Sequence, residues 1–120
     1  MPHVRVDIHE PLADLRPRMS AAIHSGLVEG WEFPADDLFQ IFTVHPAGDL
    51  FYSRTYPDAD RSDIVFIHIL AYNGYSPEVK QRGAQLVVDR LVEIGLKRDD
   101  IMISIAENGD GDWFLSLIHI

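Results

Sequence analysis

The chain has 120 residues, of which 47% are hydrophobic, 10% aromatic and 24% charged, a balance typical of a soluble globular protein with one domain over residues 1–120. Ten Lys and Arg against nineteen Asp and Glu give a formal net charge of −9, which argues against a nucleic-acid partner. The longest apolar runs are far shorter than the ~20 residues of a membrane span, and no signal-peptide pattern opens the chain, so the sequence predicts a cytoplasmic protein with no membrane partner.

The first part of the chain is predicted to form a strand, a helix and a second strand. Residues 4–8 alternate apolar and polar side chains, as in a half-buried strand. Apolar residues then recur at three- and four-residue steps, which indicates an amphipathic helix that begins after Asp14 as N-cap and ends near Gly30. Residues 38–45 are again strand-like.

A turn-rich linker over residues 47–63 follows, in which residues 50–54 could form a short hairpin. Residues 64–70 are almost all apolar, which is typical of a strand covered on both faces. The segment Ser76-Pro77-Glu78 predicts a helix start, with an N-capping Ser, a Pro at the first helical position and an acid in the first turn. Residues 101–106 form the last predicted strand.

Two halves, residues 2–46 and 64–106, therefore repeat the order strand, helix, strand. The segments Asp36-Asp37-Leu38 and Asp99-Asp100-Ile101 match at an offset of 100 − 37 = 63 positions. The repeat predicts an α+β fold of two tandem βαβ units, with a four-stranded sheet and both helices on one face. Because the other face needs cover, we expect self-association through the sheet. An unrelated ferredoxin-like fold with the same order of elements, as a monomer or dimer, is the alternative.

Pro2 directly follows the initiator methionine at the start of the first strand. Proline cannot donate to a sheet, so the first position of a strand is one of its few permitted places, and its role could be structural. Removal of Met1 ahead of this small residue would instead leave Pro2 with a free secondary amine. A rigid amine of this kind can move a proton beside a carbonyl as general base or acid.

Five segments in order carry a likeness to a known family: Met1-Pro2 with the strand at 4–8, Phe33–Gln40, Arg61–Ile67, Ser76–Gln81 and Glu107–Trp113. With them the chain resembles the tautomerase superfamily, and most of all malonate semialdehyde decarboxylase and the related cis-3-chloroacrylic acid dehalogenase. The resemblance implies a homotrimer with active sites near the amino termini, at subunit interfaces. It also implies an isomerase whose substrate is a small carboxylate, a 2-oxo acid or its enol.

The same resemblance implies roles for particular residues. Pro2 matches the catalytic proline, and Asp37 matches an acid that positions or activates water in the decarboxylase group. Trp113 and Phe114 match a region whose aromatic side chains wall the pocket. The alternatives are that Asp37 is a turn or capping residue and that Trp113 packs in the core or an interface.

The sequence departs from the family between the third strand and the second helix, where arginines hold the substrate carboxylate. The aligned places carry Tyr72 and Tyr75, with Asn73 between them. A tyrosine hydroxyl donates a hydrogen bond but carries no fixed positive charge, so decarboxylation or hydration is less expected than keto–enol tautomerisation. Other cations are candidate substitutes in substrate binding: Arg5, on the polar side of the first strand, and Arg54 and Arg61, which flank the linker. Each could instead be a solvated surface arginine.

No cofactor and no metal site are predicted, because the chain has no cysteine and its six histidines show no metal-ligand spacing on one element. The leading hypothesis is a tautomerase that uses Pro2 for proton transfer, with Asp37 and the tyrosines shaping the pocket. A catalytically silent small-ligand-binding or structural trimer of the same fold stays open, as does the ferredoxin-like dimer. The apolar residues 115–120 could form a terminal strand against a neighbouring subunit.

Overall fold

The computed structural model describes residues 1–116. Its elements in chain order are strand β1 (Pro2–His9), 3-10 helix η1 (Glu10–Leu15), helix α1 (Arg16–Trp31), strands β2 (Gln40–His45) and β3 (Val65–Tyr72), helix α2 (Pro77–Glu93), 3-10 helix η2 (Arg98–Asp100) and strand β4 (Ile101–Asn108). No helix in this part of the chain is long and apolar enough to cross a membrane.

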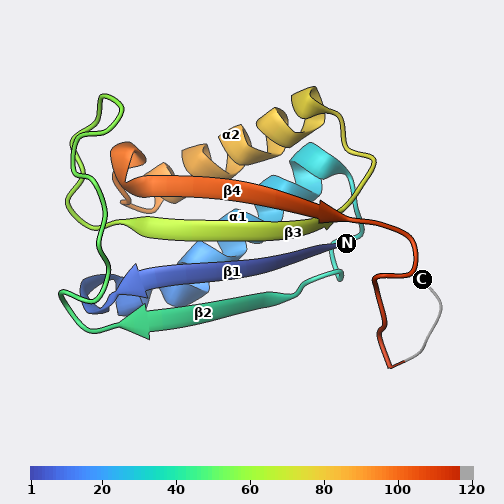
Figure 1. Ribbon diagram of the computed structural model, residues 1–120, viewed down its shortest axis with the longest axis horizontal. Coiled ribbons are helices and arrows are strands. Elements are labelled where there is room, and N and C mark those ends of the chain that lie inside the picture. The colour runs from blue at the N-terminus through green and yellow to red at the C-terminus, as the bar shows by residue number, and fades with distance from the viewer. Residues whose placement is uncertain (117–120) are drawn as a thin grey trace.

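The four strands form one sheet in the order β2-β1-β3-β4, and both helices lie on one face of it (Figure 1). β1 pairs with β2 in parallel and β3 with β4 in parallel, whereas the central β1–β3 pairing is antiparallel. The predicted fold of two tandem βαβ units is therefore confirmed. The ferredoxin-like alternative is wrong, because a split βαβ unit places another strand between the two parallel strands that are direct neighbours here.

The two halves repeat each other closely in sequence position. Shifting β1 by 63 positions gives Val65–Tyr72, which is β3, as the internal match predicts. The parallel pairings align Val4 with Gln40 and Val65 with Ile101, so the partner strand lies 36 positions further on in both halves. The repeat thus sets the register of the strands as well as their order.

The core lies between the sheet and the helices, because the central strands β1 and β3 bury every second side chain along most of their length, whereas the edge strands β2 and β4 are only partly buried. In β3 the residues Val65, Ile67, Ile69 and Ala71 are buried, while His68 is exposed. The prediction that residues 64–70 are covered on both faces is not met within one chain. We call the helix-free side of the sheet the open face.

The two helices pack closely because glycines meet at their crossing. A Cβ atom at Gly30 of α1 would lie 2.5 Å from the Cα of Gly83 in α2, and one at Gly83 would lie 2.2 Å from Nε1 of Trp31. No side chain fits at either position without movement of the neighbour. This contact fixes Trp31, the last residue of α1, against α2.

Local details differ from the sequence predictions in two places. Asp14 lies inside η1 and does not cap α1, because a 3-10 turn precedes the helix and places Leu15 at its N-cap without a side-chain bond. Residues 50–54 form no hairpin; side-chain bonds to the main chain hold this part of the linker instead. The capping prediction for Ser76 is confirmed, since its Oγ accepts a hydrogen bond from the N–H of Val79 at 3.2 Å. Residues 117–120 of the predicted terminal strand lie outside the described residues.

Candidate active site

The amino end of the chain lies beside a carboxylate. The amino nitrogen of Met1 is 3.5 Å from Oδ2 of Asp37, and both side chains are largely shielded from solvent. Pro2 is buried and pairs with Ala71 at the end of β3. The nitrogen of Pro2, one residue further on, is therefore held at the edge of the same acidic site.

A turn between α1 and β2 positions Asp37. Its N–H donates to the carbonyl of Pro34 at 3.0 Å, and Nε2 of His24 donates to the carbonyl of Ala35 at 2.6 Å. Oδ1 of Asp37 is buried and has no hydrogen-bond partner in the described part of the chain. This carboxylate caps no main-chain N–H of residues 1–116, although Asp37 closes the turn that begins at Pro34.

Tyr75 lies close to the same carboxylate. Its ring packs against Trp31, with ring centroids 4.7 Å apart. Burial raises the pKa of the Tyr75 phenol above 10.0, and the negative charge of Asp37 raises it further. Tyr75 is consequently a neutral hydrogen-bond donor at ordinary pH.

The hydroxyl of Tyr72 is already engaged. It donates to Oδ1 of Asp110, and this hydrogen bond is the main cause that raises the pKa of Tyr72, ahead of burial and of the charge of Asp110. The N–H of Asn73 donates to the carbonyl of Asn108 at 2.7 Å. These bonds tie the loop after β3 to the turn after β4, so within one chain Tyr72 and Asn73 position this turn.

An aromatic pocket of about 230 Å³ opens at the amino end, and its lining residues are Met1, His3, Phe39, Trp113, Phe114 and Leu115. Trp113 and Phe114 follow β4 at one edge of the sheet, whereas Phe39 precedes β2 at the other. The segment after β4 therefore runs past the start of β1, at the end where Figure 1 places the amino terminus. Nε1 of Trp113 is buried and has no partner in the described residues.

Three lining residues, His3, Phe39 and Leu115, were not singled out from the sequence. His3 had a usable signal, because it alternates with the buried Val4 and so faces the open side of the sheet. That side could be assigned to a pocket only once the sheet order was known.

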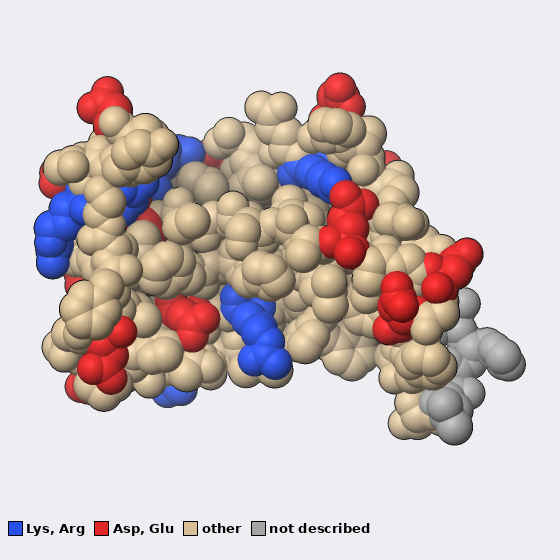
Figure 2. Space-filling view, in the orientation of Figure 1, with Lys and Arg blue, Asp and Glu red and all other residues tan. Residues whose placement is uncertain are grey.

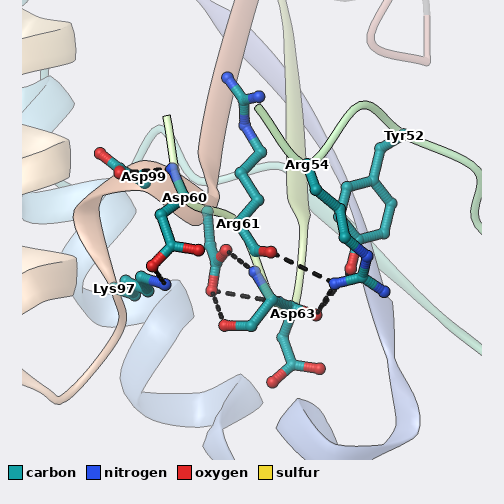
Figure 3. Close-up of polar contacts among 9 residues, drawn as sticks. Tyr52, Arg54, Asp60, Arg61, Asp63, Lys97 and Asp99 are labelled. Atoms are coloured by element: carbon teal, nitrogen blue, oxygen red, sulfur yellow. Dashed lines mark hydrogen bonds and ion pairs between the residues drawn. The ribbon is translucent and has the colours of Figure 1, made fainter. Parts of the chain in front are cut away.

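Arg54 and Arg61 contact the main chain of the linker. Figure 3 shows the guanidinium of Arg54 directed at the main chain of Arg61. The guanidinium of Arg54 donates to the carbonyl of Arg61 at 3.2 Å and lies 5.1 Å from the ring centroid of Tyr52. Arg61 donates to the carbonyl of Ser53 at 3.0 Å. Both arginines thus stabilise the linker in a single chain.

The linker lies at the opposite end of the sheet from the amino terminus (Figure 1). Pro2 pairs with Ala71, whereas Ile8 pairs with Val65, directly after the linker. At roughly 3.4 Å per residue these two pairs are about 20 Å apart along the strands. One chain therefore does not bring Arg54 or Arg61 to the site around Pro2.

Asp100 anchors the end of the linker. Its side chain is almost fully buried, and its carboxylate accepts hydrogen bonds from the N–H groups of Ser62 at 2.8 Å and Asp63 at 3.2 Å. The neighbouring Asp99 accepts from the N–H of Asp60 at 2.9 Å. In residues 1–116 no three His, Asp or Glu side chains are grouped so that they could hold a metal ion.

Comparison with known proteins places this site in a family. A family model described as tautomerase enzyme matches residues 37–116, which is more than half of the chain. The chain belongs to the tautomerase family. The crystal structure of FG41 malonate semialdehyde decarboxylase, inhibited by 3-bromopropiolate, is 32% identical, with a TM-score of 0.88 over 93% of this chain and 87% of that one. The match supports membership of the malonate semialdehyde decarboxylase-like group of this superfamily.

The chain is also similar to a further tautomerase sequence and to a further solved structure. Probable tautomerase YusQ of Bacillus subtilis (strain 168) is 27% identical over 116 residues, which cover 94% of this chain and 91% of that protein. Q0 fused 4-OT, at 14% identity, has the same fold, with a TM-score of 0.75 over 94% of this chain and 90% of that one. In the present chain Asp37, Trp113 and Phe114 lie at the amino end, whereas residues 72–75 contain no arginine.

Proposed function

We propose that this tautomerase-like enzyme uses Pro2, freed by removal of Met1, to transfer a proton between carbon and oxygen of a small 2-oxo acid or its enol. The position of the amino end carries the proposal, because Met1 both lines the aromatic pocket and lies 3.5 Å from Asp37. An amine at this place would meet a substrate in the pocket on one side and a carboxylate on the other. No cofactor is needed for such an isomerisation.

The proposed reaction needs one group to carry the proton and others to stabilise charge. For ketonisation of an enol, the neutral Pro2 amine takes the hydroxyl proton, and the resulting ammonium delivers a proton to the neighbouring carbon. Asp37 stabilises the positively charged amine between the two steps. The neutral phenol of Tyr75 donates a hydrogen bond to the substrate oxygen as negative charge develops there.

The test is the ketonisation of phenylenolpyruvate, followed by ultraviolet absorbance, with protein whose mass shows that Met1 has been removed. Because general acid–base catalysis contributes about 10²- to 10⁴-fold, Pro2→Ala should lower the rate by at least about 100-fold. Pro46→Ala, an exposed proline at the far end of β2, is the matched control and should keep the wild-type rate. Equal rates in wild type and Pro2→Ala would refute the proposal.

We further propose that other copies of the chain cover the open face in a homotrimer. Ile41 and Met102 on this face are 40% and 52% exposed, which favours burial against another subunit. Q0 fused 4-OT, which has the same fold, is a symmetric trimer. Light scattering after size exclusion should give a mass of three chains, and a mass of one or two chains would contradict this arrangement.

The missing arginines support a second candidate, a trimer that binds a small ligand without turning it over. Arg54 and Arg61 are bound to the linker main chain, so within one chain they do not replace the guanidinium groups that residues 72–75 lack. Thermal stabilisation by a 2-oxo acid without turnover in the wild type would favour this candidate over the enzyme.

A further inference from the structure

β1 presents a row of polar side chains on the open face. Val4, Val6 and Ile8 point into the core, so His3 and Arg5 face the other side of the sheet. His3 lines the aromatic pocket. Arg5 is the next residue on the same face, about 6.8 Å along the strand, which is within the reach of an extended arginine side chain.

Arg5 has no acidic partner within the described residues of its own chain. It forms no ion pair with any Asp or Glu of residues 1–116. The next acid on this face, Asp7, is engaged by Nε2 of His45 at 2.7 Å. The residues directly opposite Arg5 are His68 on β3 and Ile41 on β2, so neither neighbouring strand supplies a carboxylate there.

The surroundings of Arg5 on the open face are mostly uncharged. Figure 2 shows the open face, where basic surface over β1 and β2 interrupts a largely uncharged middle, while acidic surface dominates the end near the amino terminus. Of the ten Lys and Arg side chains, four form ion pairs with Asp or Glu in residues 1–116, namely Lys80, Arg90, Lys97 and Arg98, and Arg5 is not one of them. If another copy covers this face, Arg5 leaves water, and a buried charge is tolerated only when it is paired.

We propose that Arg5 binds the carboxylate of the substrate, with hydrogen bonds from His3 and His68 beside it. Arg5 on β1 then supplies the guanidinium for the substrate carboxylate, since residues 72–75 contain no arginine. A guanidinium suits this role because its planar fork of donors matches a carboxylate, and each imidazole can donate one further bond. The inference rests on the proposed function and deepens it by naming the group that selects an anionic substrate.

The pocket next to Arg5 defines the rest of the substrate. Its volume of about 230 Å³ exceeds the ~150 Å³ of an engineered apolar cavity that holds benzene, and three of its walls are aromatic side chains. A ring would lie between Phe39, Trp113 and Phe114, with its carboxylate toward β1. The substrate class is therefore a small carboxylate that carries an aromatic or similarly sized apolar group.

The test is calorimetric binding of 3-phenylpropanoate and of its uncharged analogue 3-phenylpropanamide to the assembled protein. Arg5→Gln should weaken carboxylate binding by about tenfold or more, which corresponds to about 1.4 kcal/mol, and should leave amide binding unchanged. Arg5→Lys should restore part of the affinity, because it keeps the charge but not the fork. Arg82→Gln, an exposed arginine on α2, is the matched control and should bind like the wild type.

Two results would overturn the assignment: equal carboxylate binding by wild type and Arg5→Gln, or no preference of the wild type for the carboxylate over the amide. If Arg5→Gln does not assemble, Arg5→Lys still tests the role of Arg5. If Arg5→Lys bound the carboxylate as tightly as the wild type does, and also bound the amide as tightly, the role would again be refuted. These ligands do not react, so the outcome is independent of whether Pro2→Ala retains activity.

Discussion

Replacing Gly30 by alanine tests the close contact between α1 and α2. The added Cβ would lie 2.5 Å from the Cα of Gly83 and 2.8 Å from its nitrogen, whereas ordinary contacts begin at 3.4 Å. The helices must therefore separate by 3.4 − 2.5 = 0.9 Å at this point. The obstacle is main chain, so rotation of a side chain cannot relieve it.

The expected cost follows from two opposing effects. Alanine gains about 1 kcal/mol of helix propensity over glycine, while overpacking with a shift of the backbone costs about 1–3 kcal/mol. Separated helices also lose contacts around Trp31, so we expect a net loss of about 1–2 kcal/mol. For a chain of this size, such a loss lowers Tm by about 5 °C.

The assay is thermal unfolding followed by circular dichroism, with the near-ultraviolet signal reporting the Trp31–Tyr75 ring pair. Ser25→Ala, at an exposed position of the same helix, is the control and should unfold at or slightly above the wild-type temperature. If Gly30→Ala unfolded at or above the wild-type temperature, the backbone contact would not limit the helix packing. Unchanged Tm would thus refute the reasoning.

Three further predictions concern Asp37, Tyr75 and Asp100. Asp37→Asn removes a negative charge beside Tyr75, so the pKa of its phenol should fall but stay above 10.0, because burial is the larger cause; ultraviolet titration against Tyr75→Phe measures it, and an unchanged midpoint would contradict the contact. The folded state holds the Tyr75 proton more tightly than the unfolded chain does, so the contribution of Tyr75 to the free energy of unfolding is fully present below pH 10.0 and is lost as the pH rises further. Urea unfolding at several pH values measures this decline, which Tyr75→Phe should reduce. Asp100→Ala leaves the N–H groups at 62 and 63 without their acceptor and should cost about 1–3 kcal/mol in urea unfolding, whereas Asp58→Ala, an exposed linker acid, should cost almost nothing; equal effects would argue against the anchor.

The sheet was predictable because its signals are local and occur twice. The match between Asp36-Asp37-Leu38 and Asp99-Asp100-Ile101 gives the offset that relates β1 to β3, and the right-handed crossover rule then places both helices on one face. The start of α1 was misplaced because Asp14 has the composition of an N-cap, whereas a 3-10 turn already occupies that position. Residues 50–54 form no hairpin, and the side chains of Arg54 and Arg61 bond to the main chain of the linker instead.

The site was less predictable, because it depends on which distant segments meet. Asp37 and Trp113 were suggested by the family resemblance, and the structure brings both to the amino end. The sequence does not show which groups an arginine side chain contacts. It therefore offers Arg54 and Arg61 as substrate-binding candidates, whereas the structure shows both bonded to the main chain of the linker. The alternation of β1 is enough to predict that Arg5 is exposed. That no carboxylate lies opposite Arg5 follows only from the pairing of β1 with β2 and β3, which the sequence does not give.

The equal register of the two halves also limits where amine chemistry can occur. Position 65 corresponds to position 2 by the shift of 63, but the nitrogen of Val65 belongs to a peptide bond and has no basicity. The duplicated scaffold can therefore support the proposed proton transfer at only one of its two equivalent ends. At the start of β3 no free amine is needed, and Asp100 instead binds the main chain of the linker just before that strand. The pocket lies at the amino end.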